Sequence, residues 1–352
     1  MKIDLLCNDG SPIGVTPSEI YGKGVGGAEL ALMTTMQALA ARGHDISIFN
    51  DPRQGEGVYE GVQYRNLKTY DSSRSVDVLI NFRSPNHRVG PRTGAKRLIW
   101  WSLDQAVGGG SPVEMAAKAD AIVLISPFHK NYMLTTYGTP AEKITVIDCG
   151  VRTFEYNGDV ERIPGRLIFC SVPDRGLAGV LNAWGVIKAA APKASLVITA
   201  DYRLWGCGPG NQNHRLAWAG QPDVEFLGAV PRAELCRLQQ QAEIMAYPCI
   251  YEELFCIAVA ECEVAGAVPV TPAIGAIETT NEFGIVIRGD AYSQEFLAAW
   301  SKRIIALLGP EHDFLETKRQ TMMKLARDRF NMDRIADQWE AVLVGKPGGG
   351  MT

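Results

Sequence analysis

The chain has 352 residues, more than a single hydrophobic core usually supports, so we expect two domains. Hydrophobic residues make up 46% of the chain and charged residues 21%, the balance of a globular protein and not of a disordered one. The formal net charge of −4 argues against a protein whose main partner is a nucleic-acid backbone, because neutralising phosphates requires a surplus of Lys and Arg. The net charge does not exclude a local basic groove.

The cysteines and the apolar runs indicate the cellular compartment of the protein. Eight cysteines are scattered without a C-x-x-C pair, which predicts buried, reduced thiols and neither disulfides nor a zinc site. The first residues, Met1 to Leu6, are typical of a strand and not of a signal peptide, because the apolar stretch is short. No window approaches the roughly 18 apolar residues of a membrane span. We therefore expect a cytoplasmic protein without a transmembrane segment, with peripheral membrane contact still open.

In the first half of the chain, short apolar runs alternate with helical patterns. Residues 28–42 repeat apolar side chains at helical spacing, and Gly43 follows them. The predicted strands are Ile3–Cys7, Asp45–Phe49, Val76–Asn81, Arg97–Trp101, Ala121–Ser126 and Ile144–Ile147. This alternation of strand and helix predicts a doubly wound parallel sheet.

The same alternation restarts after residues 151–166, which lack apolar periodicity and contain Pro164 and Gly165. The predicted strands are Leu167–Ser171, Ser195–Ala200, Val224–Leu227, Ile244–Tyr247, Val268–Thr271 and Gly284–Ile287. The predicted helices are Gly179–Ala190, Arg232–Gln241 and Ile257–Ala265, and residues 294–344 are helical throughout.

These patterns predict two Rossmann-like α/β domains, residues 1–150 and residues 167–320, joined by a linker at residues 151–166. Residues 321–345 would form a terminal helix able to pack back on the first domain, and residues 346–352 a flexible tail. Two such domains leave a cleft facing the carboxyl ends of both sheets, and a ligand is expected there.

A glycine-rich connection at residues 8–27 joins the first strand to the first helix, and Gly26 and Gly27 directly precede that helix. Glycines let backbone amides approach an anion, and the helix dipole favours negative charge at the same place. The spacing is not the G-x-G-x-x-G of dinucleotide-binding proteins. A flexible surface loop therefore stays an alternative interpretation.

A second candidate site follows a predicted strand and opens a helix at residues 251–270. Glu253 falls in the loop before the helix, and Glu261 lies more than two turns inside it. The first amides of such a helix are free to bind a diphosphate. Glu261 has almost entirely apolar neighbours, so an ordinary solvated helix position is the weaker interpretation, because a buried carboxylate is costly without partners.

Glu253, seven residues, Glu261 and then Ala-Gly-Ala-Val-Pro-Val resemble the donor-site signature of the family-four retaining glycosyltransferases. Three further segments resemble the family in the same order: Gly26-Gly27-Ala28-Glu29, Ile125-Ser126-Pro127-Phe128, and residues 171–177. The resemblance spans about residues 1–287 and implies the GT-B fold, two Rossmann-like domains with a cleft between them. It implies transfer of a hexose from a nucleoside-diphosphate sugar, with UDP or GDP as the carrier, to a hydroxyl acceptor.

The resemblance also implies residue roles. Glu253 would contact the donor sugar, Glu261 the ribose, and Arg175, which stands where the family usually has Lys, a phosphate of the leaving group. The implied donor-binding residues are Gly26, Gly27, Ser171, Arg175, Glu253, Leu254, Phe255, Cys256, Ile257 and Glu261.

Two positions depart from the family pattern. Ser171 stands where a second cation is usual, so Arg175 would act alone. Leu103 stands at the place of a histidine, which leaves Asp104 as the expected contact to the acceptor hydroxyl or the donor sugar, with a helix-capping role as the alternative. Since neither a D-x-D triplet nor an H-x-x-x-H pair occurs, no metal and no cofactor are expected, and arginine with helix amides would replace a cation.

Other functions on the same fold stay open. A nicotinamide-dependent oxidoreductase would need the compact glycine motif that is missing. A nucleotide-sugar isomerase or phosphorylase would share the cleft, and a catalytically weak nucleotide-sugar-binding protein would fit the departures at Leu103 and Ser171. The acceptor can be a glycan, a lipid-linked glycan, a small metabolite or a modified base, and nucleic acid is disfavoured as an acceptor without being excluded.

Overall fold

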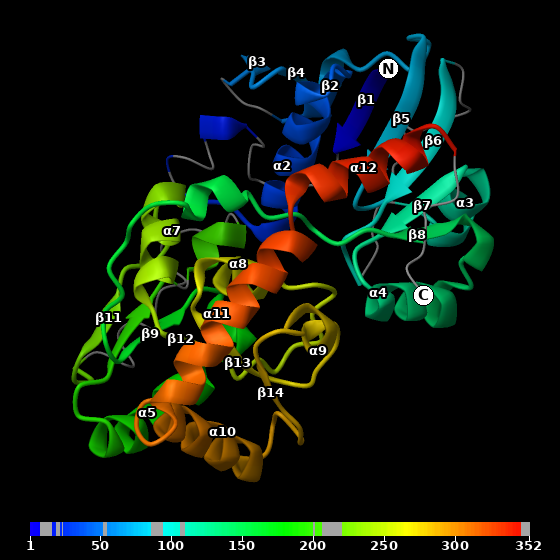
Figure 1. Ribbon diagram of the computed structural model, residues 1–352. Helices are drawn as coiled ribbons and strands as arrows, with labels where there is room; N and C mark the ends of the chain where they lie inside the picture. Colours follow the sequence, from blue (N-terminus) through cyan, green and yellow to red (C-terminus); the bar gives the residue numbers. More distant parts are fainter. Residues whose placement is uncertain are drawn as a thin grey trace. The chain divides into compact units, whose positions relative to one another are not determined.

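The computed structural model describes residues 1–7, 16–18, 22, 24–51, 55–85, 94–105, 110–199, 201–205 and 220–345. The chain divides into two compact units (Figure 1). The first unit comprises Met1–Glu19, Ala28–Gly150 and Met332–Thr352. The second comprises Ile20–Gly27 and Val151–Asn331.

The sheet of the first unit has eight strands in the order β3-β4-β2-β1-β5-β6-β7-β8. Its strands are β1 (Lys2–Cys7), β2 (Asp45–Asn50), β3 (Gly57–Tyr59), β4 (Val62–Asn66), β5 (Val76–Phe82), β6 (Ala95–Trp101), β7 (Ala121–Leu124) and β8 (Ile144–Val146). Only the edge pair β3–β4 is antiparallel among these strands. The chain builds outward from β1 in one direction and from β5 in the other, which confirms a doubly wound sheet with its switch point between those two strands.

The described helices of the first unit are α2 (Gly27–Ala41), α3 (Pro112–Lys118), α4 (Pro127–Tyr137) and α12 (Met332–Leu343), with 3₁₀ turns η1 (Leu67–Thr69) and η2 (Ala141–Lys143). Two of these helices begin at a serine cap. Ser111 caps α3, and Ser126 accepts a hydrogen bond from the His129 amide at the start of α4. Each cap satisfies an amide that the helix itself leaves without a partner.

The last helix, α12, belongs to the first unit. Its Trp339 packs edge-on against Trp101 of β6, with the ring centroids 4.7 Å apart. Asp337 and Glu340 pair with Arg42 at the end of α2, at 2.5 and 2.9 Å. This helix begins at Met332 and not near residue 321, because the chain leaves the preceding helix at the buried Phe330, and Asn331 bridges to Val151.

The sheet of the second unit has six parallel strands in the order β11-β10-β9-β12-β13-β14. Its strands are β9 (Arg166–Phe169), β10 (Ser195–Ile198), β11 (Val224–Phe226), β12 (Ile244–Ala246), β13 (Val268–Pro272) and β14 (Ile285–Ile287). Here the chain builds outward from β9 and from β12, so the switch point lies between these two strands. Ligands of doubly wound sheets bind beyond the carboxyl ends of the strands at such a point.

The helices of this unit are α5 (Leu177–Ala190), α7 (Arg232–Gln241), α8 (Ile257–Ala265), α9 (Ile277–Thr280), α10 (Gln294–Leu307) and α11 (His312–Arg329), with 3₁₀ turns η3 (Thr153–Tyr156), η4 (Pro173–Arg175) and η5 (Tyr202–Trp205). The predicted bounds of α7 and α8 are confirmed. The segment expected as a linker carries η3, whose Tyr156 is buried, and it lies within the second unit.

The seven cysteines among the described residues are free, and all but Cys256 are buried, as the sequence predicts. Cys207 lies outside the described residues. Within the described part of the chain, no helix combines the length and the apolar character that crossing a membrane requires.

Helix α8 contains a carboxyl group, that of Glu263, whose burial disfavours its charged form. Glu263 is fully buried, and its Oε1 accepts a hydrogen bond from the Phe283 amide at 3.1 Å. Its Oε2 has no hydrogen-bond partner. Burial raises the pKa of this carboxyl to about 8, so the group folds largely protonated at neutral pH.

We predict that Glu263→Gln stabilises the protein in a pH-dependent way. The folded-state pKa lies above the unfolded value, so the wild-type carboxyl costs nothing below about pH 4 and progressively destabilises the fold up to about pH 8. The variant should therefore match the parent at pH 4 and gain a few kcal/mol at pH 8, at about 1.36 kcal/mol per pKa unit. Thermal unfolding across this range measures the gain, with exposed Glu278→Gln as the control. Equal differences at both pH values would contradict it.

Candidate functional site

The amino end of α8 is open to a ligand. Cys256 precedes the helix with φ 74° and ψ 79°, and no side chain caps the helix. The first amides of an α-helix have no partner inside it, and the dipole makes this end attractive to an anion. The uncapped amides at Cys256 and Ile257 are therefore suited to an anion.

The end of the glycine-rich connection lies against this helix end. A Cβ atom added at Gly27 would lie 2.8 Å from Cγ2 of Ile257, so a larger residue at this position would displace the Ile257 side chain. Gly26, half-buried, directly precedes it. Residues 8–15, 19–21 and 23 of the predicted connection lie outside the described residues. The structure thus brings Gly27 and Ile257 together.

An ion pair stands at the switch point of the same sheet. Arg175 comes from η4, after β9, and Glu253 from the loop after β12, the neighbouring strand. Arg175 Nε lies 3.1 Å from Glu253 Oε1, and the guanidinium stacks on the ring of Tyr251 at 3.3 Å from its centroid. The side chains of Arg175 and Glu253 are 16% and 18% exposed, so the pair is partly screened from water.

Two hydroxyl groups extend this ion pair. The Tyr247 hydroxyl donates to Glu253 Oε1 at 3.2 Å, and Ser171 Oγ lies 3.3 Å from that hydroxyl. Ser171 therefore joins the cluster by a hydrogen bond at the position where a second cation was expected. Sequence reasoning missed Tyr247, although its place at the end of a strand of the switch point was a usable signal.

The backbone fixes the two loops that carry the pair. Gly176 has φ 105°, and a Cβ atom there would overlap the Pro248 carbonyl, so the turn after Arg175 packs directly on the loop after β12. The Ala276 amide donates to the Glu253 carbonyl at 2.7 Å. The position of the pair is thus set by main-chain contacts and not by side-chain packing alone.

Burial is the largest influence on the ionisable groups beside the ion pair. Burial raises the pKa of the Glu253 carboxyl, and the Arg175 charge and the Tyr247 hydroxyl act in the opposite direction. Burial raises the pKa of the neighbouring Cys249 thiol to about 12 and that of Cys256 well above its usual value. Both thiols are therefore neutral near pH 7 and are no nucleophiles at this pH.

Glu261 occupies a separate, buried cluster. It is 3% exposed, which confirms that it is not a solvated helix residue. Arg232 Nη1 donates to its Oε1 at 2.6 Å, and Gln239 Nε2 lies 3.4 Å from its Oε2. Leu254 and Phe255, between the two glutamates, are also buried, and Phe255 packs edge-on against Phe330. Sequence reasoning missed Arg232, because a partner so distant in sequence leaves no local pattern.

Asp104 lies in the first unit. Arg83 donates to both of its oxygens, at 2.8 and 2.9 Å, and to Glu29 at 3.3 Å. The helix-capping alternative is wrong, since Ser111 caps the following helix. Arg83 follows β5 with φ 61°, a backbone conformation that is costly for a residue with a side chain. Asp104 and Glu29 thus flank one cation at the carboxyl edge of this sheet.

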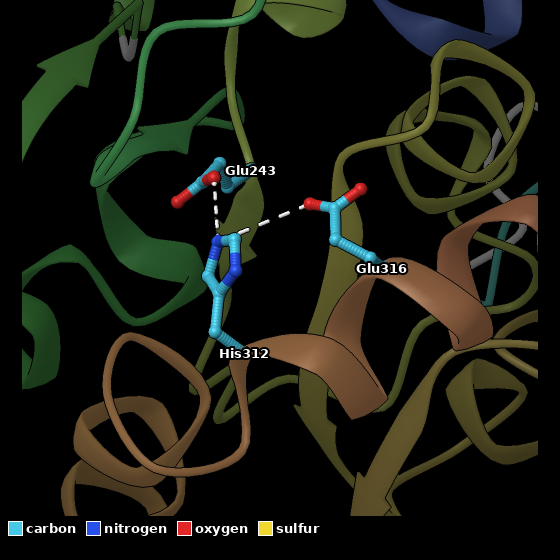
Figure 2. Close-up of side chains that lie close together, drawn as sticks. All are labelled: Glu243, His312 and Glu316. Carbon is cyan, nitrogen blue, oxygen red and sulfur yellow. Dashed lines mark hydrogen bonds and ion pairs between the residues drawn. The ribbon is translucent and has the colours of Figure 1, made fainter.

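Glu243, His312 and Glu316 form the group of described residues with a spacing suitable for a metal ion, since their ligand atoms lie within 4.8 Å of one another (Figure 2). Each carboxylate already has protein partners. Glu243 Oε1 lies 3.0 Å from His312 Nε2, and its Oε2 accepts the Gly165 amide at 2.8 Å. Glu316 pairs with Arg319. We interpret the group as a structural cross-link between the residue before β12 and helix α11.

A scan against protein-family models found no match, and a search of curated proteins found none either. Solved structures do match. Sucrose-phosphate synthase from Thermosynechococcus elongatus has a TM-score of 0.77 at 15% identity, over 97% of this chain and 98% of that one. The catalytic domain of starch synthase IV from Arabidopsis thaliana, bound to ADP and acarbose, has a TM-score of 0.72 at 10% identity, over 97% and 98%.

HepE from Anabaena, in complex with UDP and glucose, has a TM-score of 0.67 at 15% identity, over 98% of this chain and 99% of that one. At these identities the likeness establishes the fold. The chain therefore has the GT-B fold of these glycosyltransferases, built from two parallel-sheet α/β units, as the sequence resemblance implied.

Proposed function

We propose that this chain is a retaining glycosyltransferase that transfers a hexose from a nucleoside-diphosphate sugar to a hydroxyl acceptor. The observation that carries the proposal is the Arg175–Glu253 pair at the switch point, in the unit that also presents the uncapped end of α8. A cation and free amides suit a diphosphate, and a carboxylate suits sugar hydroxyls. The structural neighbours that hold UDP or ADP support this choice of ligand.

The proposed reaction breaks the bond between the anomeric carbon and the diphosphate oxygen, and forms a bond from that carbon to the acceptor oxygen. The acceptor proton leaves with the diphosphate. Negative charge grows on the leaving diphosphate, and Arg175 with the amides at Cys256 and Ile257 offsets it. Glu253 accepts hydrogen bonds from the sugar and holds the anomeric carbon in place.

The remaining assignments complete the proposal. Glu261 contacts the ribose, and Gly26, Gly27 and Ser171 line the donor site. Asp104 contacts the acceptor hydroxyl or the donor sugar. We further propose that UDP or GDP carries the hexose, that no metal or cofactor takes part, and that the reaction takes place in the cytoplasm, where the free cysteines stay reduced.

Mass spectrometry tests the function directly. The protein is incubated with UDP-, GDP- and ADP-sugars and a panel of glycan, lipid-linked and small-molecule acceptors. Glycosylated product, with the anomeric configuration of the donor by NMR, supports the proposal. Altered or released sugar that needs no acceptor supports an isomerase or phosphorylase instead. Binding without any turnover supports a nucleotide-sugar-binding protein.

We predict that transfer survives chelation. Arg175 and the helix amides supply the positive charge that a divalent ion would otherwise provide. The rate in excess EDTA should stay within about twofold of the untreated rate. A rate that collapses in EDTA and returns with magnesium or manganese would contradict metal independence.

We predict that Arg175→Ala lowers the turnover number by two or more orders of magnitude with the fold intact. Removing one donor that stabilises transition-state charge typically costs about 2.7–4 kcal/mol. Arg288→Ala removes an exposed arginine of the same unit, also paired with a glutamate, and serves as the control. Steady-state kinetics and circular dichroism compare the variants. Near-normal turnover in Arg175→Ala would place the stabilising charge elsewhere.

We predict that Glu253→Gln and Glu261→Gln separate catalysis from donor binding. Removing a contact to a non-reacting group raises KM, whereas removing one that strengthens in the transition state lowers kcat. Glu261→Gln should weaken binding of the free nucleoside diphosphate, and Glu253→Gln should leave it nearly unchanged while slowing transfer. Calorimetric titration and kinetics check both. If both variants bind the diphosphate like the parent, Glu261 has only a structural role.

A further inference from the structure

Arg232 is a buried cation that the proposed reaction leaves without a role. It is the first residue of α7 and only 4% exposed. Besides its bond to Glu261, its Nε donates to Glu155 Oε2 at 2.7 Å and its Nη2 to the Tyr156 hydroxyl at 3.0 Å. Burying a charge so completely is costly unless every partner is in place. The hydrogen-bond partners of Arg232 therefore indicate its role.

The partners of Arg232 form a closed ring around Glu261. The Tyr156 hydroxyl donates to Gln239 Oε1 at 2.8 Å, and Gln239 Nε2 lies 3.4 Å from Glu261 Oε2. Each oxygen of Glu261 thus faces one donor of the ring. A carboxylate can accept about four hydrogen bonds. The ring fixes the plane of the carboxylate and still leaves acceptor positions for two hydroxyl groups.

Glu261 lies about one helical turn beyond the helix end where we place the diphosphate. It is four residues after Ile257 on α8, so the two side chains share a face about 6 Å apart along the axis. Ile257 marks the helix end where Gly27 and the proposed diphosphate meet. Because the carboxylate is so deeply placed, a hydroxyl that binds it leaves water. A ligand that lacks that hydroxyl then leaves a charged acceptor unsatisfied.

Resting on the proposed function, we propose that Arg232 is a positioning residue that orients Glu261 toward the ribose and thereby makes the donor site selective for ribonucleotides over 2′-deoxyribonucleotides. The site accepts UDP-, GDP- or ADP-linked sugars by this criterion and rejects sugars linked to thymidine diphosphate, whose ribose lacks the 2′-hydroxyl. Burial raises the pKa of the Glu261 carboxyl, and the adjacent Arg232 charge opposes this effect. Without Arg232 the carboxyl loses the cation that opposes its protonation and one of the donors that orient it.

The test is a ratio of affinities measured by calorimetry. UDP, GDP and ADP are titrated first, and the best binder is compared with its 2′-deoxy counterpart in each variant. A hydrogen bond to a charged group contributes about 1.5–3 kcal/mol, so the parent should prefer the ribonucleotide about 10- to 150-fold. Arg232→Met and Glu261→Gln should each lower the preference below about threefold, mainly by weakening the ribonucleotide. Arg232→Lys, which keeps the charge, should fall between them and the parent.

Control variants distinguish a wrong inference from a loss of fold and from a wrong proposed function. Arg237→Met removes an exposed arginine of the same helix and should keep the parent's ratio. Both nucleotides are titrated into the same preparation, so a loss of folded protein does not change the ratio of the two affinities. Glu261→Gln tests the ring even if Arg232→Met does not fold. A parent without preference, or an Arg232 or Glu261 variant that keeps it, overturns the inference while the proposed function stands. A parent that binds none of the three diphosphates counts against the proposed function itself.

Discussion

The ion pair between Arg175 and Glu253 depends on two loops that leave neighbouring strands at one switch point. A guanidinium and a carboxylate 3.1 Å apart would gain little if both were free to move in water. Here Gly176 lets one loop touch the backbone of the other, and the Ala276 amide holds the Glu253 carbonyl. The conformational entropy of the two side chains is therefore lost on folding and not on binding. Both groups are already positioned for a ligand that carries charge and hydroxyl groups.

Helix α8 and the loop before it show how a carboxyl's partner determines what it can do. Glu253 keeps 18% of its side chain exposed beside a stacked arginine, so a ligand can share its contacts. Glu261 is enclosed by a ring of donors that fixes its orientation. Glu263 accepts a backbone hydrogen bond, but burial outweighs this bond and the charge of Arg329, so the carboxyl is largely protonated at neutral pH. The three residues have the same side chain, and the different roles that we propose for them rest only on their surroundings.

Much of the architecture could be predicted from the sequence, because strand and helix periodicity is local. The predicted bounds of α7 and α8 match the structure, and the apolar neighbours of Glu261 indicated its burial. The edge pair β3–β4 was missed, since β3 has only three residues, although the alternation of Val62, Gln63, Tyr64 and Arg65 indicated β4. The partners Arg83 and Arg232 could not be predicted, because each meets its carboxylates through tertiary contacts across the unit.

The central claim is that the switch point of the second unit binds a nucleoside diphosphate. A crystal structure with UDP or GDP bound tests it most directly. The account predicts the diphosphate against the amides at Cys256 and Ile257, with the Arg175 guanidinium on a phosphate and the ribose at Glu261. A nucleotide bound at the carboxyl edge of the first unit's sheet, or in the second unit away from Arg175 and α8, would contradict it.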